Sequence, residues 1–442
     1  MDISRGKTPT AQETFVQMAQ AAGLRGRVLI TLGLLLLVRF GIFIPIPGID
    51  RDNFAAAIQN LPGLGFLDIF TGGGLSALGI FALGILPFIN ASIIMQLLTA
   101  AIPKLEDLQK NEGEAGRRKI SQITRYVALG GAIIQSIALT STLLNRPEIA
   151  IEPGFAFVAE TTLALTAGAM FVMWISEIIT ERGIGNGASL LIFVNIVAVL
   201  PSTLGNTIEL ASDNLQRGNR AVLAQIVILL VVFLVTIVGI VFVQEGTRRI
   251  PIVSAKTQVG KRYRRERKSY LPLRLVQGGV MPIIFASSVL VLPSFLSGLP
   301  IFQGSPIFEP ILNALRPGNF IYLGVYILLI VAFSFFYSSL IFNPLDVSQN
   351  LKKMGSSIPG IRPGKATSQY LEKVSNRLTF LGAIFLGLVA TIPTLVESVT
   401  QITTFRGIGA TSLLILVGVA IDTAKQIQTY VISQSYERMV KQ

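Results

Sequence analysis

Cysteine and histidine are both absent from this chain of 442 residues. Their absence excludes disulfides, zinc or haem sites built from Cys and His, and every Ser-His or Cys-His catalytic arrangement. Charged residues are scarce too, at 14% of the chain, where a soluble globular domain has about 25%. Since 51% of the residues are hydrophobic and the mean hydropathy is +0.64, we expect a polytopic membrane protein. The missing cysteine and histidine lead us to expect no catalytic, metal or cofactor site in it.

Ten stretches are long and apolar enough to cross a membrane, which takes about 20 residues for a helix. They cover residues 24–44, 76–102, 121–144, 156–180, 187–205, 221–243, 274–298, 319–343, 375–396 and 410–431. The first is too long for a signal peptide and follows a polar tail, so we expect it to be retained. The predicted fold class is an all-α membrane protein.

Lysine and arginine are distributed unevenly among the segments that join these stretches. Thirty of the 37 lie in the two tails and in the segments after even-numbered spans, six lie in the other segments, and Arg39 lies inside the first span. Basic residues concentrate on the cytoplasmic side of membrane proteins. The asymmetry therefore predicts that both termini are cytoplasmic and that the number of spans is even.

Five spans in each half of the chain would make the second half enter the membrane from the opposite side. This predicts two inverted five-helix halves with a functional path at their interface. The predicted parts are a cytoplasmic amino tail, an amino-terminal half, an outer hinge, a carboxy-terminal half and a cytoplasmic carboxy tail, at residues 1–23, 24–205, 206–220, 221–431 and 432–442.

The segment after the first span, at residues 61–79, is apolar but too short to cross. Its core runs from Leu64 to Phe70 and is followed by Gly72, Gly73 and Gly74. One interpretation is a re-entrant half-helix with a glycine hinge, centred on 61–75, and the other is an outer loop with a glycine turn. The pattern by itself is compatible with both.

Two long basic segments, at 245–273 and 344–374, follow the sixth and eighth spans. In the first, alternation at Ile250, Ile252 and Val253 predicts a β-hairpin. In the second, two Pro-Gly pairs frame Arg362 on an exposed tip. Such segments are attracted to anionic lipid, or they dock onto a large anionic partner such as a ribosome. Two long protrusions on one chain favour docking.

The central parts of the predicted spans are nearly free of charge. Arg39, Glu177 and Asp422 lie near span ends, and Glu397 lies at the outer end of the ninth span. A secondary transporter keeps ionisable groups deep in its helices, so this scarcity disfavours that class. A membrane-embedded enzyme is disfavoured because the core has no histidine, cysteine or acid pair.

Seven stretches, in order along almost the whole chain, resemble the SecY family, the channel subunit of the bacterial and cyanobacterial protein translocase. They are RFGIFIPIPGID (Arg39–Asp50), FALGILPFINASIIMQLL (Phe81–Leu98), EGEAGRRKISQITRY (Glu112–Tyr126), ITERGIGNGASLLIF (Ile179–Phe193), GGVMPIIFASSVLVLP (Gly278–Pro293), PGIRPG (Pro359–Gly364) and GATSLLI (Gly409–Ile415).

The resemblance implies a channel for unfolded polypeptides, with two five-helix halves around an hourglass pore. It implies a pore ring at Ile85, Ile89, Ile192, Ile284 and Ile415. It implies a plug formed by Leu64, Phe66, Leu67, Asp68, Phe70, Gly72, Gly73 and Gly74. It implies a lateral gate, through which transmembrane helices pass into lipid, with Asn90, Gln135 and Ser288 along its seam.

The resemblance also implies partners and a location. The SecA motor would engage the tip at Arg362, and a ribosome would dock at a basic cluster that includes Arg248, Arg249, Lys261, Arg262, Arg264 and Arg265. Other expected partners are the SecE and SecG subunits, unfolded secretory and membrane-protein substrates, and anionic lipids. The expected location is the bacterial plasma membrane, with the thylakoid membrane as a second one.

Overall fold

The fold was analysed on a computed structural model, which describes residues 22–46, 68, 70–144, 154–216, 221–254, 258–259, 262–263, 268–296, 310–311, 314–315, 319–400 and 410–441. A helix lies in each of the ten predicted spans: α2 (Ala22–Gly41), α5 (Leu86–Ala101), α7 (Gly113–Leu144), α8 (Phe155–Arg182), α9 (Gly187–Gln216), α10 (Ala221–Glu245), α11 (Met281–Leu296), α13 (Phe320–Ile341), α15 (Lys365–Thr400) and α16 (Ala410–Lys441). Two short polar helices, α6 (Pro103–Lys110) and α14 (Pro344–Lys353), lie between them.

Length and composition alone qualify five of the described helices as membrane spans: α7, α8, α10, α13 and α15. The bent pair α5 and α6 makes a sixth, with an angle of 105° at the break before Pro103. Proline at the first position of α6 lacks the N–H that would continue α5, so the chain turns there. The structure thus supports a helical, multi-span chain.

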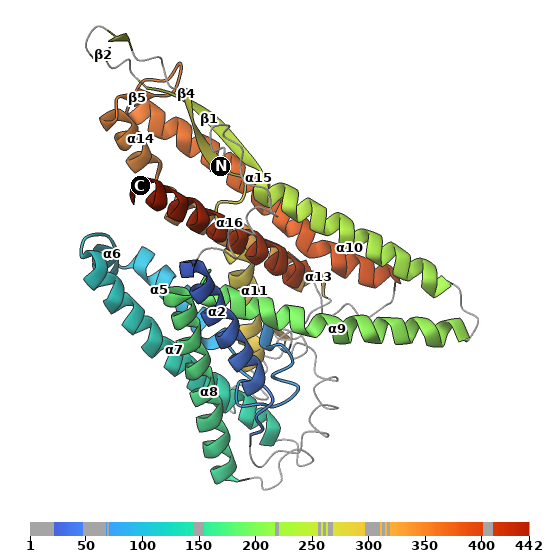
Figure 1. The fold of residues 1–442 in the computed structure, drawn as a ribbon. Helices are drawn as coiled ribbons and strands as arrows, with labels where there is room; N and C mark the ends of the chain where they lie inside the picture. The colour runs from blue at the N-terminus through green and yellow to red at the C-terminus, as the bar shows by residue number, and fades with distance from the viewer. Residues whose placement is uncertain are drawn as a thin grey trace.

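The helices form two groups that follow chain order (Figure 1). In the amino-terminal group, α7 packs on α5 and α8, and α8 also contacts α2 and α9. In the carboxy-terminal group, α13 packs between α11 and α15, and α10 packs on α15 and α16. The two groups meet where α11 contacts α5 and α7 and where α16 contacts α9. One apolar core, which includes Ile89, Ile192 and Ile415, extends through both groups.

Three predicted boundaries differ from the structure. The second span was expected from residue 76, but the chain forms turns until α5 begins at Leu86. The seventh was expected from 274, but β4 reaches Arg274 and α11 begins only at Met281. The expected hinge at 206–220 is helical as far as Gln216, because α9 continues through Pro201.

The turns before α5 are held against the end of α2. Ile80 N–H donates to the carbonyl of Ile44 at 3.0 Å, and Ile46 N–H donates to that of Leu78 at 3.4 Å. A side chain at Gly79 would collide with the backbone carbonyl of Ile42, so glycine is needed for this close approach. Buried backbone here finds partners outside a helix, which hydropathy cannot predict.

The predicted hairpin after the sixth span is confirmed. Strand β1 (Thr247–Ser254) pairs antiparallel with β4 (Lys268–Arg274), and β5 (Ser356–Ser357) joins the other edge of β1. A two-stranded extension, β2 (Gln258–Val259) and β3 (Arg262–Tyr263), continues the hairpin. Ile250 and Leu273 pack against Ile358 and Leu371 in a separate small core. The two basic segments therefore form one folded unit (Figure 1).

Candidate functional site

A cavity of about 340 Å³ lies between the two helix groups, lined by residues of α5, α7, α8, α9 and α11. Its apolar lining includes Phe88, Ile89, Ile192, Ile284 and Phe285. Its polar lining includes Ser92, Gln96, Arg125, Glu177, Glu181 and Ser189. A cavity with an apolar lining and a polar lining accepts a ligand that is itself partly apolar and partly charged.

Three of the five predicted pore residues, Ile89, Ile192 and Ile284, line this cavity together. Ile85 lines a much smaller cavity, with Phe81 and Asn195. Ile415 is fully buried on α16 and belongs to the same apolar core as the other four. The five side chains thus come from four helices and the turn before α5, and three of them share one cavity.

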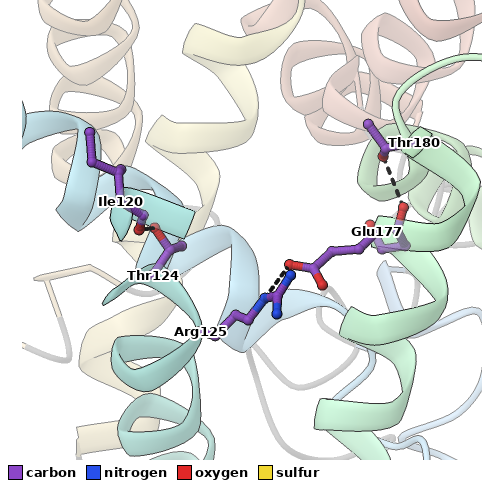
Figure 2. A network of polar contacts seen from close by, with 6 residues as sticks. Ile120, Thr124, Arg125, Glu177 and Thr180 are labelled. Carbon is purple, nitrogen blue, oxygen red and sulfur yellow. Dashed lines mark hydrogen bonds and ion pairs between the residues drawn. The ribbon is translucent and has the colours of Figure 1, made fainter. Parts of the chain in front are cut away.

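An ion pair joins α7 and α8 at the cavity wall. Arg125 Nε lies 2.8 Å from Glu177 Oε1, and Figure 2 shows the two side chains reaching toward each other from their helices. The Arg125 side chain is 45% exposed and that of Glu177 17% exposed. The carboxylate is therefore held by a charge-assisted hydrogen bond while the guanidinium stays partly open to solvent.

Of the predicted plug, Asp68, Phe70, Gly72, Gly73 and Gly74 lie in the described part of the chain. Leu64, Phe66 and Leu67 lie outside the described residues. Helical backbone at Asp68 and Phe70 ends at the glycines, where Gly72 and Gly73 have φ of 69° and 84°. These left-handed conformations favour glycine, so the three-glycine run is the end of a helical segment.

Two side chains from distant helices bind this segment. Asn195 Nδ2, on α9, donates to the carbonyl of Phe70 at 2.8 Å. Arg39, at the end of α2, donates to the carbonyl of Gly72 at 2.5 Å. Within the segment, Asp68 Oδ1 accepts from Ser76 N–H at 2.7 Å. The carbonyls of Phe70 and Gly72, at the end of the helical segment, therefore have donors from outside it.

The three predicted gate residues are buried on helices that meet at the contact between the two groups. Asn90 is on α5, Gln135 on α7 and Ser288 on α11, with exposed fractions of 7%, 4% and 3%. The amide oxygens of Asn90 and Gln135 and the hydroxyl of Ser288 have no hydrogen-bond partner within the described structure. Buried polar atoms of this kind are rare, and each one lowers the cost of separating the surfaces that bury it.

The predicted docking residues Arg248 and Arg249 are exposed on β1, and Arg362 is exposed in the turn that precedes α15. Thr367 Oγ1 donates to the carbonyl of Arg362 at 2.8 Å, which holds the backbone of this turn. Arg262 lies in β3, while Lys261, Arg264 and Arg265 lie outside the described residues. The structure thus joins Arg248, Arg249 and Arg362 in one folded unit.

Sequence reasoning missed Asn195, which binds the Phe70 carbonyl, and Tyr337, whose hydroxyl donates to Gln96 at the cavity wall. Asn195 was one of several mildly polar residues in apolar spans, and Tyr337 stood in an aromatic-rich span. The only sequence signal for Asn195 is a polar side chain in the middle of an apolar helix, which a helix–helix contact explains equally well.

Comparison with known proteins agrees with this architecture. The SecY family model matches residues 79–424. The chain is 70% identical to the protein translocase subunit SecY of Synechocystis sp. over the full length of both, and 68% identical to that of Synechococcus elongatus, also over the full length of both. It is 43% identical to the chloroplastic preprotein translocase subunit SECY of Spinacia oleracea, over 94% of this chain and 74% of the relative.

Solved structures share the fold at low sequence identity. A protein-conducting channel matches with a TM-score of 0.63 at 18% identity, covering 91% of each chain. Sec61 in a canine ribosome-channel complex matches with a TM-score of 0.62, also at 18% identity and 91% coverage of each. On the full-length identity to the cyanobacterial relatives, the chain belongs to the SecY family of protein translocase subunits.

Proposed function

We propose that the chain is a non-enzymatic channel that passes unfolded polypeptides across the membrane and releases apolar segments sideways into lipid. The observation that carries the proposal is the cavity between the two groups, where Ile89, Ile192 and Ile284 meet a polar lining that includes Glu177 and Gln96. A chain entering from water would meet polar groups and an apolar constriction in the same space. We further propose that all ten helices in the predicted spans cross the membrane, as two inverted halves at 24–205 and 221–431.

The proposed seal is the ring of five isoleucines with the segment at 61–75 as its plug. A narrow aliphatic constriction repels water and ions, yet its side chains adapt around a passing polypeptide of any sequence. The bonds from Asn195 and Arg39 to Phe70 and Gly72 support this role, because they hold the end of the segment against the walls of the amino-terminal group.

The proposed exit to lipid is the contact between α5 and α7 on one side and α11 and α13 on the other. Asn90, Gln135 and Ser288 support this assignment, since polar atoms without partners make a weak contact. When an apolar helix replaces this contact, the free energy lost from the closed contact and the free energy gained with the entering helix are both small. Modest differences in free energy between the closed and open states therefore decide whether the exit opens.

The proposed partners dock on the unit formed by β1, β4, β5 and the turn at Arg362. We propose the SecA motor at Arg362, a ribosome at Arg248, Arg249 and the cluster at 261–265, and SecE, SecG and anionic lipids around the helices. Chains with a similar fold occur in two solved structures, Sec61 in a canine ribosome-channel complex and a yeast Ssh1 complex bound to the 80S ribosome. These structures support the proposal that a ribosome is a partner.

The proposed location is the plasma membrane, with both termini cytoplasmic. The thylakoid membrane is a second proposed location, since one relative is chloroplastic. The charge asymmetry of the connecting segments supports this orientation.

Transport into sealed vesicles tests the function directly. The full chain, reconstituted with the proposed partners and ATP, should carry a reporter preprotein into the lumen, where added protease cannot reach it. The matched control is the same reporter with its apolar signal segment replaced by a polar one. Equal protection of both reporters, or protection of neither, would contradict the proposal.

A further inference from the structure

A hydrogen bond links the two helix groups beside the cavity. Tyr337 Oη on α13 donates to Gln96 Oε1 on α5 at 2.7 Å, across 241 residues of sequence. Gln96 lines the cavity, as does Phe285 of α11, which stacks edge-on against the Tyr337 ring with centroids 5.2 Å apart. The bond therefore lies where a segment leaving the cavity toward lipid would pass.

Packing holds the Tyr337 ring in this position. Its side chain is 9% exposed, and Phe285 contacts a second aromatic ring of α13, Phe333, edge-on at 5.8 Å. Edge-to-face pairs of this kind favour one ring orientation. The hydroxyl is thus presented to α5 by a buried aromatic cluster rather than by a free side chain.

The residue after Tyr337 ties α13 to its own group instead. Ser338 Oγ donates to Gln277 Oε1 at 2.7 Å and accepts from Thr379 Oγ1 of α15 at 2.8 Å. Gln277 Nε2 in turn donates to Ser375 Oγ of α15 at 3.0 Å. Because several bonds hold α13 on α15, separation of the two groups would break the bond to Gln96 before it moved α13 away from α15.

We propose that the Tyr337–Gln96 bond sets how apolar a polypeptide segment must be to part the two groups and leave toward lipid. The inference rests on the sideways release in the proposed function. Within the described part of the chain, Asn90 Oδ1, Gln135 Oε1 and Ser288 Oγ have no hydrogen bond to lose when the seam opens. Tyr337 does lose one, and the transfer of apolar surface from the segment into lipid offsets this loss. The pair is therefore a specificity-determining contact.

Export of graded reporters tests the pair. The reporters carry signal segments in which leucine is replaced stepwise by alanine, and transport is measured in vesicles that hold the full chain and its partners. Tyr337→Phe keeps the ring and removes the hydroxyl, while Gln96→Met removes the acceptor and keeps the length. Each should raise export of the weakest transported segment roughly fivefold, the effect of losing one neutral hydrogen bond.

The double variant should export no more than either single variant, since both remove the same bond. The matched control is Ser339→Ala, which removes a hydroxyl of α13 that bonds only within its own helix, to the carbonyl of Phe336. It should export like the unmodified chain. The two single variants act from opposite ends of the bond, so a folding defect in one leaves the other as the test.

Two results overturn the inference. One is unchanged export of the weakest segments in Tyr337→Phe and Gln96→Met. The other is a double variant whose gain is the product of the single gains. An unmodified chain that exports the strongest segment supports the proposed function whatever the variants do, so failure of the pair and failure of the channel are separate outcomes.

Discussion

Asn195 and Phe70 are 125 residues apart in the sequence, yet Asn195 Nδ2 donates to the Phe70 carbonyl at 2.8 Å. Both residues are buried, and Arg39 donates to the carbonyl of Gly72 two residues further on. A segment that the sequence leaves open between a half-helix and a loop is thus bound by side chains from α2 and α9. Its displacement requires these two bonds to break.

Asn195→Ala should weaken the seal of the idle channel. The change removes the hydrogen bond from Asn195 to the Phe70 carbonyl, which costs about 1 kcal/mol and shifts the bound segment toward release roughly fivefold. Ion conductance of the reconstituted chain in planar bilayers measures the effect. Ser202→Ala on the same helix, whose hydroxyl bonds the carbonyl of Val199, is the matched control and should leave conductance unchanged. Equal conductance in both variants would contradict the anchoring role.

A disulfide at the same contact should lock the segment in place. The chain has no native cysteine, so the pair Phe70→Cys with Asn195→Cys introduces the only two thiols. Oxidation should stop transport of a preprotein, and a reductant should restore it. Each single cysteine variant is the control and should respond to neither reagent. Full transport with the disulfide formed would show that the segment does not block the path.

Polar substitutions in the isoleucine ring should let ions through. Ile89 lines the cavity and Ile415 is fully buried, so Ser at both positions adds hydroxyls where aliphatic groups exclude water. Conductance of the idle channel should rise, and reporters with weakly apolar signals should pass. Leu at both positions keeps the apolar character and should conserve the seal. Unchanged ion conductance in the Ser variant would show that Ile89 and Ile415 do not form part of the seal.

Much of the fold follows from the sequence because apolar length and alternation are local properties. The helices of the ten predicted spans and the hairpin at Ile250, Ile252 and Val253 are of this kind. The turns at 72–85 are not, since they depend on contacts of Gly79 with Ile42 in another part of the chain. A hydropathy scan cannot distinguish buried turns from a buried helix.

The site is less predictable than the fold for the same reason. Arg39 lies near the end of the first predicted span, and nothing in the sequence indicates that its guanidinium binds the carbonyl of Gly72. Tyr337 on α13 and Gln96 on α5 are 241 residues apart, and nothing in the spacing of the two residues indicates their hydrogen bond. The roles proposed for the five isoleucines rest on a family resemblance, since single isoleucines in apolar helices are otherwise indistinguishable; they are Ile85, Ile89, Ile192, Ile284 and Ile415.

Neutralising Glu177 should lower export of signals that begin with basic residues. Glu177→Gln leaves the Arg125 guanidinium unpaired at the cavity wall, where it repels an entering cation. For a pair this exposed the effect is at most about 1 kcal/mol, or roughly fivefold in export. Raising the salt concentration should shrink it. The double variant Arg125→Gln with Glu177→Gln removes both charges and should export normally. A deficit that persists in the double variant would exclude this electrostatic cause.

Arg362→Glu should abolish motor-driven transport while ribosome binding persists. Arg362 lies in an exposed turn whose backbone is held by Thr367. Its guanidinium is accessible there and can bind a carboxylate through two parallel hydrogen bonds. Arg362→Lys keeps the charge but not the paired donors, and it should recover only part of the transport. ATP-dependent protection of a preprotein in vesicles measures both variants.

Charge reversal at Arg248 and Arg249 should act on the other partner. Both side chains are exposed on β1, and their loss should weaken ribosome binding and reduce its salt dependence, because each phosphate contact releases a counterion. If the basic unit is only attracted to anionic lipid, the reversals at Arg362 and at Arg248 and Arg249 should have similar, small effects. Each basic residue contributes about 1 kcal/mol to binding at an anionic membrane surface. Ribosome binding and ATP-driven transport, measured in the same vesicles, separate the two explanations. If Arg362→Glu transports normally, the turn is not the motor's docking point.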